Sequence, residues 1–192
     1  EKIKDYHRAI YHRLKELAQD PDDIRKARGI TFGALSGLYS KINDLEKSLE
    51  YSIKEFNYKI KTASTDAEKS ILHEQLAASI ITKIQNIHDD TELVKLYFLH
   101  KEKAHSYNKK SYDVSLSLAS MHERRSDIKR AIEVLEVTVK ARAVEDNATA
   151  LMYSRLGGLY GKIGDNTGAT EYLNKAKKLI DLSIDFESDQ IA

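Results

Sequence analysis

The chain has 192 residues, of which 32% are charged and 41% are hydrophobic, so it is apolar enough to fold into one domain or a stack of small repeats. Its 31 basic and 30 acidic residues leave a formal charge of +1, without the basic excess that nucleic-acid binding usually needs. The absence of cysteine excludes disulfides, cysteine-based zinc sites and a thiol nucleophile, and it fits either a reducing cytosol or a bacterial periplasm.

Turn and capping signals divide the chain into about nine helices with short links. The first ends near Ala18, because Pro21 and the residue before it disfavour helical geometry. Asn43 and Thr65 each precede a glutamate by three residues, which indicates a capping box at a helix start. The expected helices lie at about 2–18, 23–42, 43–61, 65–87, 89–106, 112–124, 126–142, 145–163 and 167–184, and the acidic tail beyond is expected to fray. No segment alternates with period two, so no strand is expected.

An internal unit is clearest near the end of the chain. Its first helix carries Tyr153, Leu156, Gly157 and Tyr160, its turn carries Gly164-Asp165, and its second helix carries Ala169, Tyr172 and Ala176. This unit resembles a tetratricopeptide repeat, with tyrosine in place of the first tryptophan and without the terminal proline. Gly157 and Gly161 are expected to leave the first helix bare, so that the second helix can cross it closely at Ala169.

Looser copies of the unit occur earlier in the sequence. One runs through Phe32, Leu35, Tyr39, Asn43-Asp44, Ser48 and Tyr51, one through Ile81, Thr82, Val94, Tyr97 and Phe98, and one through Leu118, Ala119, Ser126-Asp127, Ala131 and Leu135. The small second-helix residues Ala9, Ser48, Val94, Ala131 and Ala169 are 39, 46, 37 and 38 residues apart. The family period is 34 residues, so longer helices or links are expected.

The resemblance implies an all-α fold, a right-handed superhelical stack of antiparallel helical hairpins in one array over 1–192. Residues 1–21 would be the second helix of a truncated repeat, which suggests that a preceding repeat was removed. Repeats would follow at 22–63, 64–107 (long and divergent), 109–144 and 145–184, with a tail at 185–192. An irregular helical bundle is the alternative.

A candidate binding surface follows from the same resemblance. Lys41, Arg124 and Lys162 each lie six residues after the leucine of their unit, at the end of a first helix. First helices line the concave groove in this family, so these residues resemble a basic ladder for an acidic peptide. The groove residues predicted in this way are Lys41, Lys83, Asn86, Ser120, Glu123, Arg124, Ser154, Arg155 and Lys162. The alternative is structural, because a lysine at a helix C-terminus complements the helix dipole anyway.

The expected partner is therefore a protein or an extended peptide, with Tyr39, Tyr97, Tyr153 and Tyr160 as further anchors unless stacking between hairpins uses them. Arrays of this family often form sensory or regulatory segments of larger signalling proteins, so the resemblance implies such a role. A second hypothesis is a structural module that forms homodimers through its terminal repeats, using apolar residues around Ile3, Ile10 and Leu14.

Catalysis, cofactors and metals find no support in the sequence. The segment from Gly157 to Ile163 lacks the spacing and the hydroxyl residue of a phosphate-binding loop. The seven histidines are scattered, and a solvated or interfacial position is expected for each. No nucleophile motif occurs, and adjacent carboxylates are explained as helix caps. No run of 18 apolar residues predicts a membrane span.

Overall fold

A computed structural model describes residues 2–19, 26–84 and 91–189 of the chain. These residues form nine α-helices and no strand, which confirms the all-α prediction. The helices are α1 (Lys2–Gln19), α2 (Lys26–Lys41), α3 (Leu45–Thr62), α4 (Asp66–Ile84), α5 (Thr91–Tyr107), α6 (Tyr112–Arg124), α7 (Ile128–Arg142), α8 (Asn147–Lys162) and α9 (Asn166–Asp189). They fall into two compact units, residues 1–107 and 108–192, which are treated separately below.

Two predicted boundaries are wrong in detail. α9 continues to Asp189 instead of fraying after Ile184, because no glycine or proline interrupts the sequence there. The cap of α3 is Asp44 and not Asn43: the Asp44 carboxylate accepts the Lys47 N–H at 3.1 Å. The cap predicted at Thr65 is confirmed, since the Thr65 hydroxyl accepts the Glu68 N–H. The returning bond of the capping box is shifted by one residue, because the Glu68 carboxylate accepts the Ser64 N–H and not that of Thr65.

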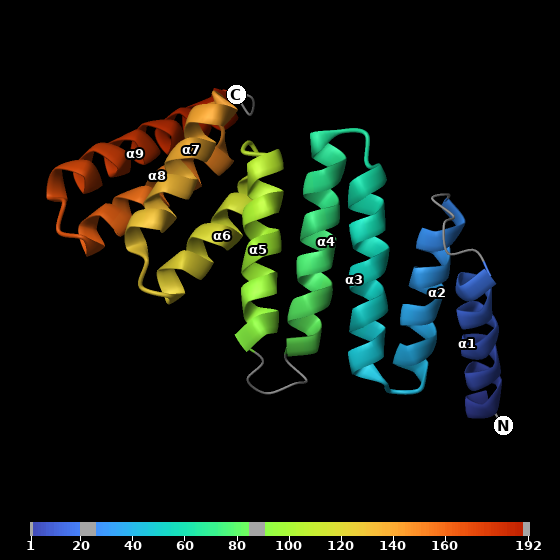
Figure 1. Cartoon of the computed structure of the whole chain (residues 1–192). Helices are drawn as coiled ribbons and strands as arrows, with labels where there is room; N and C mark the ends of the chain where they lie inside the picture. The colour runs from blue at the N-terminus through green and yellow to red at the C-terminus, as the bar shows by residue number, and fades with distance from the viewer. Residues whose placement is uncertain (1, 20–25, 85–90, 190–192) are drawn as a thin grey trace. The chain divides into compact units, whose positions relative to one another are not determined.

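In the first unit α1 to α5 stand side by side in chain order (Figure 1). The most extensive contacts join α2 to α3 and α4 to α5, and further contacts join α1 to α2 and α3 to α4. Ile10, Leu35 and Tyr39 form the buried cluster between α1 and α2. Leu49 of α3 packs with Leu76 and Ile80 of α4 in a second cluster. Apolar residues are therefore buried where α1 meets α2 and where α3 meets α4, as in a stack of hairpins.

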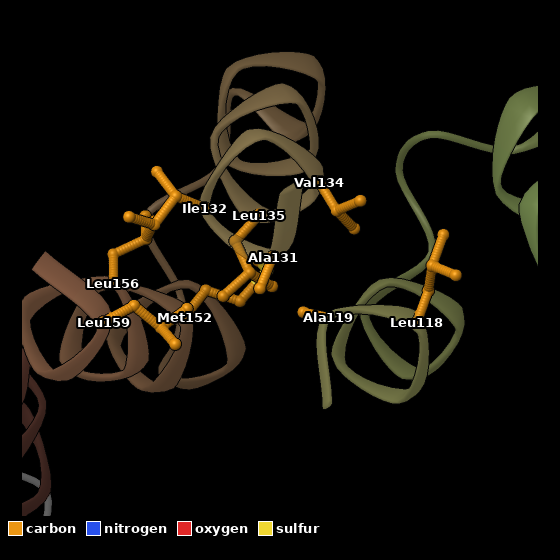
Figure 2. Close-up of a cluster of buried hydrophobic side chains, with 9 residues drawn as sticks. All are labelled: Leu118, Ala119, Ala131, Ile132, Val134, Leu135, Met152, Leu156 and Leu159. Carbon is orange, nitrogen blue, oxygen red and sulfur yellow. The ribbon is translucent and has the colours of Figure 1, made fainter. Parts of the chain in front are cut away.

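In the second unit the most extensive contacts join α6 to α7 and α8 to α9, while α8 also touches α7 and α6. Its core is a single cluster in which α7 lies between its two neighbours (Figure 2). The cluster consists of Leu118, Ala119, Ala131, Ile132, Val134, Leu135, Met152, Leu156 and Leu159. Each fully buried leucine contributes about 1.5–3 kcal/mol relative to an exposed one. α6 also contacts α8 directly in this unit.

The close crossing predicted at Gly157 is present, but Gly161 has no part in it. A Cβ placed on Gly157 would lie 2.7 Å from Leu173 Cγ and 3.1 Å from the Ala169 carbonyl oxygen. A Cβ on Gly161 would meet nothing within 4 Å. Gly168 is the second close approach, because its Cβ would lie 2.7 Å from the Tyr160 ring. The two helices therefore meet through one glycine from each, not through two glycines of the first.

Candidate functional site

An open pocket of about 280 Å³ lies in the second unit, on the face where α6 and α8 meet. It is lined by Glu123 of α6 and by Leu151, Ser154, Arg155, Gly158, Leu159 and Lys162 of α8. Most of the α8 residues recur at intervals of three or four, so they share one side of that helix. Gly158 lies in the middle of this side and has no side chain to fill the pocket. A Cβ placed on it would meet nothing within 4 Å.

Charge in the pocket is organised around Glu123. One carboxylate oxygen of Glu123 accepts a hydrogen bond from Arg155 Nη2, and the other accepts one from Lys162 Nζ. The hydrogen bond from Lys162 lowers the pKa of Glu123 below its usual value, and the positive charge of Arg155 lowers this pKa further. The three groups together keep one positive charge at neutral pH. The Glu123 side chain is only 16% exposed, whereas those of Arg155 and Lys162 are 44% and 56% exposed, so the cations reach solvent.

The pocket brings together four of the nine predicted groove residues: Glu123, Ser154, Arg155 and Lys162. Ser120 and Arg124 also lie on α6, outside the residues that line the pocket. Lys41 was predicted from the same six-residue spacing after a leucine as Lys162, but it belongs to the first unit and not to this pocket.

Lys41 ends α2, and its Nζ lies over the Tyr6 ring at 5.2 Å from the ring centroid. The side chains of Lys83 and Asn86 lie outside the described residues. Leu151 and Gly158 were not predicted, although their spacing from Arg155 would have placed them on the same side of the helix.

The tyrosines suggested as anchors pack between helices instead. Tyr39 is 6% exposed and stacks on Tyr51, with ring centroids 5.5 Å apart. Tyr160 and Tyr172 both donate hydrogen bonds to Glu136 Oε1, at 2.6 and 2.9 Å, and their rings stack on one another. The hydrogen bond to Glu136 raises the pKa of Tyr160 to about 12. These rings stabilise the contacts of neighbouring hairpins.

The part of the chain that the structure describes contains neither a metal-binding cluster nor a membrane-spanning helix. No group of three or more histidine, aspartate or glutamate side chains there is arranged to hold a metal ion. No helix formed by those residues has both the length and the apolar character that a bilayer crossing requires.

The arrangement of hairpins resembles solved helical-repeat proteins. MamA is 17% identical, with a TM-score of 0.53, and the match covers 95% of this chain and 92% of MamA. A putative kinesin light chain from Podosopora anserina, with nearly identical TPR-like repeats, is 14% identical at a TM-score of 0.53, covering 93% of this chain and 88% of that one. The C-terminal part of a TPR repeat-containing protein from Cytophaga hutchinsonii is 15% identical at a TM-score of 0.52, covering 93% and 61%.

No protein-family model and no curated protein matches the sequence. The structural likeness, which spans most of the chain, nevertheless makes this a helical-hairpin repeat protein. Within that class its fold is that of the tetratricopeptide-repeat proteins, as the unit at 153–176 indicated.

Proposed function

We propose that this chain is a scaffold that binds an extended peptide or a segment of another protein, and that the pocket of the second unit is one of its contact sites. The observation that carries the proposal is the side of α8 on which Arg155 and Lys162 reach solvent beside an exposed leucine, Leu151. Residues of α6 and α8 line this surface, and both are first helices in the predicted repeats, which supports the proposal. The fold supports a scaffold because it offers long helix faces.

The chemistry of the pocket favours an acidic side chain next to an apolar one. A ligand carboxylate can share Arg155 and Lys162 with Glu123, and a guanidinium can donate two parallel hydrogen bonds to a carboxylate. Leu151 is 56% exposed and offers apolar surface at the rim. A volume of about 280 Å³ suits one or two side chains rather than a whole small-molecule cofactor. Binding should weaken as salt rises, because the cations are partly exposed.

A charge-reversal titration tests the pocket. Fluorescein-labelled peptides that alternate acidic and apolar residues are titrated with the protein at low salt. The Arg155→Glu/Lys162→Glu variant is expected to bind at least about tenfold more weakly, because two attractive charges become repulsive. The control is Lys177→Glu/Lys178→Glu on α9, which makes the same change of net charge at exposed positions. Equal weakening by both variants, or none by either, contradicts the pocket assignment.

The same titration examines the predicted ladder. Lys41→Glu alone is expected to weaken binding of a longer acidic peptide if the first unit also takes part. Far-ultraviolet circular dichroism then checks that helicity is unchanged. If the Arg155→Glu/Lys162→Glu variant binds more weakly and Lys41→Glu does not, the site is limited to the second unit. That result contradicts the ladder hypothesis and leaves the pocket assignment in place.

Self-association is the second candidate function, and exposed apolar residues on α1 favour it. Ile3, Tyr11 and Leu14 are 61%, 64% and 37% exposed. The prediction that Ile10 joins this surface is wrong, because Ile10 is 6% exposed and packs against Leu35 and Tyr39. A regulatory role within a larger signalling protein stays a prediction, since neither the pocket nor α1 specifies one.

A further inference from the structure

Two buried histidines face one another in the first unit, far in sequence from the residues of the pocket. His73 of α4 and His100 of α5 are 4% and 6% exposed, and their Nδ1 atoms lie 2.7 Å apart. The ring centroids are 5.0 Å apart, with an angle of 32° between the planes. The peptide-binding proposal makes no use of this contact.

The contact depends on how many protons the two rings hold. At 2.7 Å one Nδ1 must donate a proton that the other accepts, so two neutral rings have to adopt different tautomers. A first additional proton can enter at an Nε2 and leave this hydrogen bond in place, although it puts a charge in a buried position. A second additional proton would place two N–H groups and two positive charges against each other. The doubly protonated pair cannot keep this geometry.

The surroundings disfavour protonation further. Burial lowers the pKa of His100 to about 4, and the charges of His73 and Lys103 act in the same direction. Burial and Lys103 also lower the pKa of His73. The nearest carboxylate in the sequence, Glu74, is engaged by Lys101 across the same two helices, with Nζ and Oε2 2.7 Å apart.

Other polar and charged groups lie on the three helices that meet here, α3, α4 and α5. The Tyr107 ring stacks on the His73 ring, with centroids 5.6 Å apart, and Lys69 Nζ lies over the Tyr107 ring. α5 also carries His105, which is buried. α3 packs on α4 through the Ser52–Ser79 hydroxyl contact, and its own charges form the pairs Glu50–Lys54 and Glu55–Lys59 along the helix. Lys103 of α5 is the cation that acts on both rings, and it disfavours their protonation.

We propose that the His73–His100 contact is a pH-sensitive element, which holds α4 against α5 while the rings are neutral and releases this hairpin when acid protonates both. The direction follows from linkage. Both rings have a lower pKa in the folded chain than the value of about 6.5 expected after unfolding, so the unfolded chain binds more protons. The stabilisation is complete above about pH 6.5 and is lost as the pH falls towards 4.

Imidazole nitrogen resonances test the geometry directly in the unmodified protein. At pH 7.5, ¹⁵N spectra should show one of the two rings protonated at Nδ1 and the other at Nε2. On acidification both rings should titrate below pH 6.5, and the amide signals of α4 and α5 should change with them. A titration of either ring at or above pH 6.5 with the contact intact overturns the proposal. A shift of both Nδ1 signals by stoichiometric Zn²⁺ also overturns it, because the pair would then be a metal site.

Urea unfolding measures the consequence. For His100 alone, lowering the pH from 7.5 to 5 should raise the unfolding equilibrium constant roughly 10- to 30-fold. The His73→Gln/His100→Gln variant should lose this share of the pH dependence. The control is His7→Gln/His12→Gln on the exposed face of α1, which should keep it.

An unchanged pH dependence in the His73/His100 variant contradicts the proposal. Should that variant fail to fold, the imidazole titration of the unmodified protein decides the question by itself. The peptide-binding proposal is unaffected by either result, since its pocket lies in the second unit and is tested by charge reversal.

Discussion

At the scale of single residues, three different small residues allow the two helices of a hairpin to cross closely: glycine, alanine and serine. The second unit uses Gly157 opposite Ala169, and Ala119 with Ala131 in its other hairpin. In the first unit a serine stands at the place of the glycine. There the Ser36 hydroxyl donates a hydrogen bond to the Ser48 carbonyl oxygen at 2.8 Å. A small side chain is therefore sufficient for close packing when its polar atom has a partner.

The glycine crossing gives the first prediction at this scale. Gly157→Leu should lower the free energy of unfolding by about 2 kcal/mol, because the new side chain must displace Leu173 and press on the Ala169 carbonyl group. Urea denaturation followed by circular dichroism measures the change. The control is Gly161→Leu in the same helix, where a Cβ meets open space. Its free energy of unfolding should stay the same or rise, since leucine favours helices more than glycine does.

Single residues also mark where sequence reasoning failed. Thr82 was expected at the crossing position of the α4 unit, yet it is exposed and its hydroxyl donates to Ala78 of its own helix. Among the α4 side chains that the structure describes, Leu76, Ala77 and Ile80 are fully buried. The 46 residues between Ser48 and Val94 exceed the usual repeat length, and either longer helices or a longer link could account for the excess. The positions of α4 that face its neighbours could therefore not be assigned from the spacing. No local pattern in the sequence resolves that choice.

At the scale of elements, three hairpins share one turn. Asn43, Ser126 and Gly164 each lie eight residues after the leucine of their unit, and all three have a left-handed backbone, with φ of 61°, 61° and 80°. The following residue is an aspartate in every case. Asp44, Asp127 and Asp165 each accept the backbone N–H three residues further on. The turn thus ends one helix and caps the next within two residues.

This turn gives a paired prediction. A non-glycine residue with a left-handed backbone is strained by about 1 kcal/mol, whereas glycine is not. Gly164→Ala should therefore lower the free energy of unfolding by about 1 kcal/mol, and Ser126→Gly should raise it by a few tenths to about 1 kcal/mol. Thermal and urea unfolding measure both changes. The two variants must change the free energy of unfolding in opposite directions. A loss of stability in both would show that side-chain contacts, and not backbone strain, determine the stability of this turn.

The sequence predicted the secondary-structure elements better than the contacts between them. Helix number and type followed from polar links and caps, because a capping aspartate or serine and the missing period-two alternation are local signals. The ion pairs of Glu123 with Arg155 and Lys162 join α6 to α8 and link residues 32 and 39 positions apart in the chain. The His73–His100 contact spans 27 residues. Such contacts depend on helix register and crossing angle, which the local pattern does not determine.

At the scale of the whole molecule, the fold is recognisable although the sequence has little identity to the solved structures that share it. Solved tetratricopeptide-repeat structures match most of the chain at 14–17% identity, while no family model matches its sequence. The reason lies in what the fold requires. Large side chains such as Leu35, Leu118 and Leu156 and small ones at the crossings must recur, but serine, alanine and glycine can each serve as the small residue. The same packing can therefore be built from sequences that share few identical residues.

The oligomeric state is the prediction that concerns the molecule as a whole, and it separates the two candidate functions. If the second candidate holds, α1 pairs with another copy through Ile3 and Leu14, and the sedimentation coefficient rises with protein concentration. Ile3→Glu/Leu14→Glu should then abolish the rise, because it puts charge into an apolar contact. Ile71→Glu, at a position of α4 that is 58% exposed, is the control and should leave association unchanged. A mass that stays monomeric at every concentration eliminates self-association and leaves peptide binding as the candidate function.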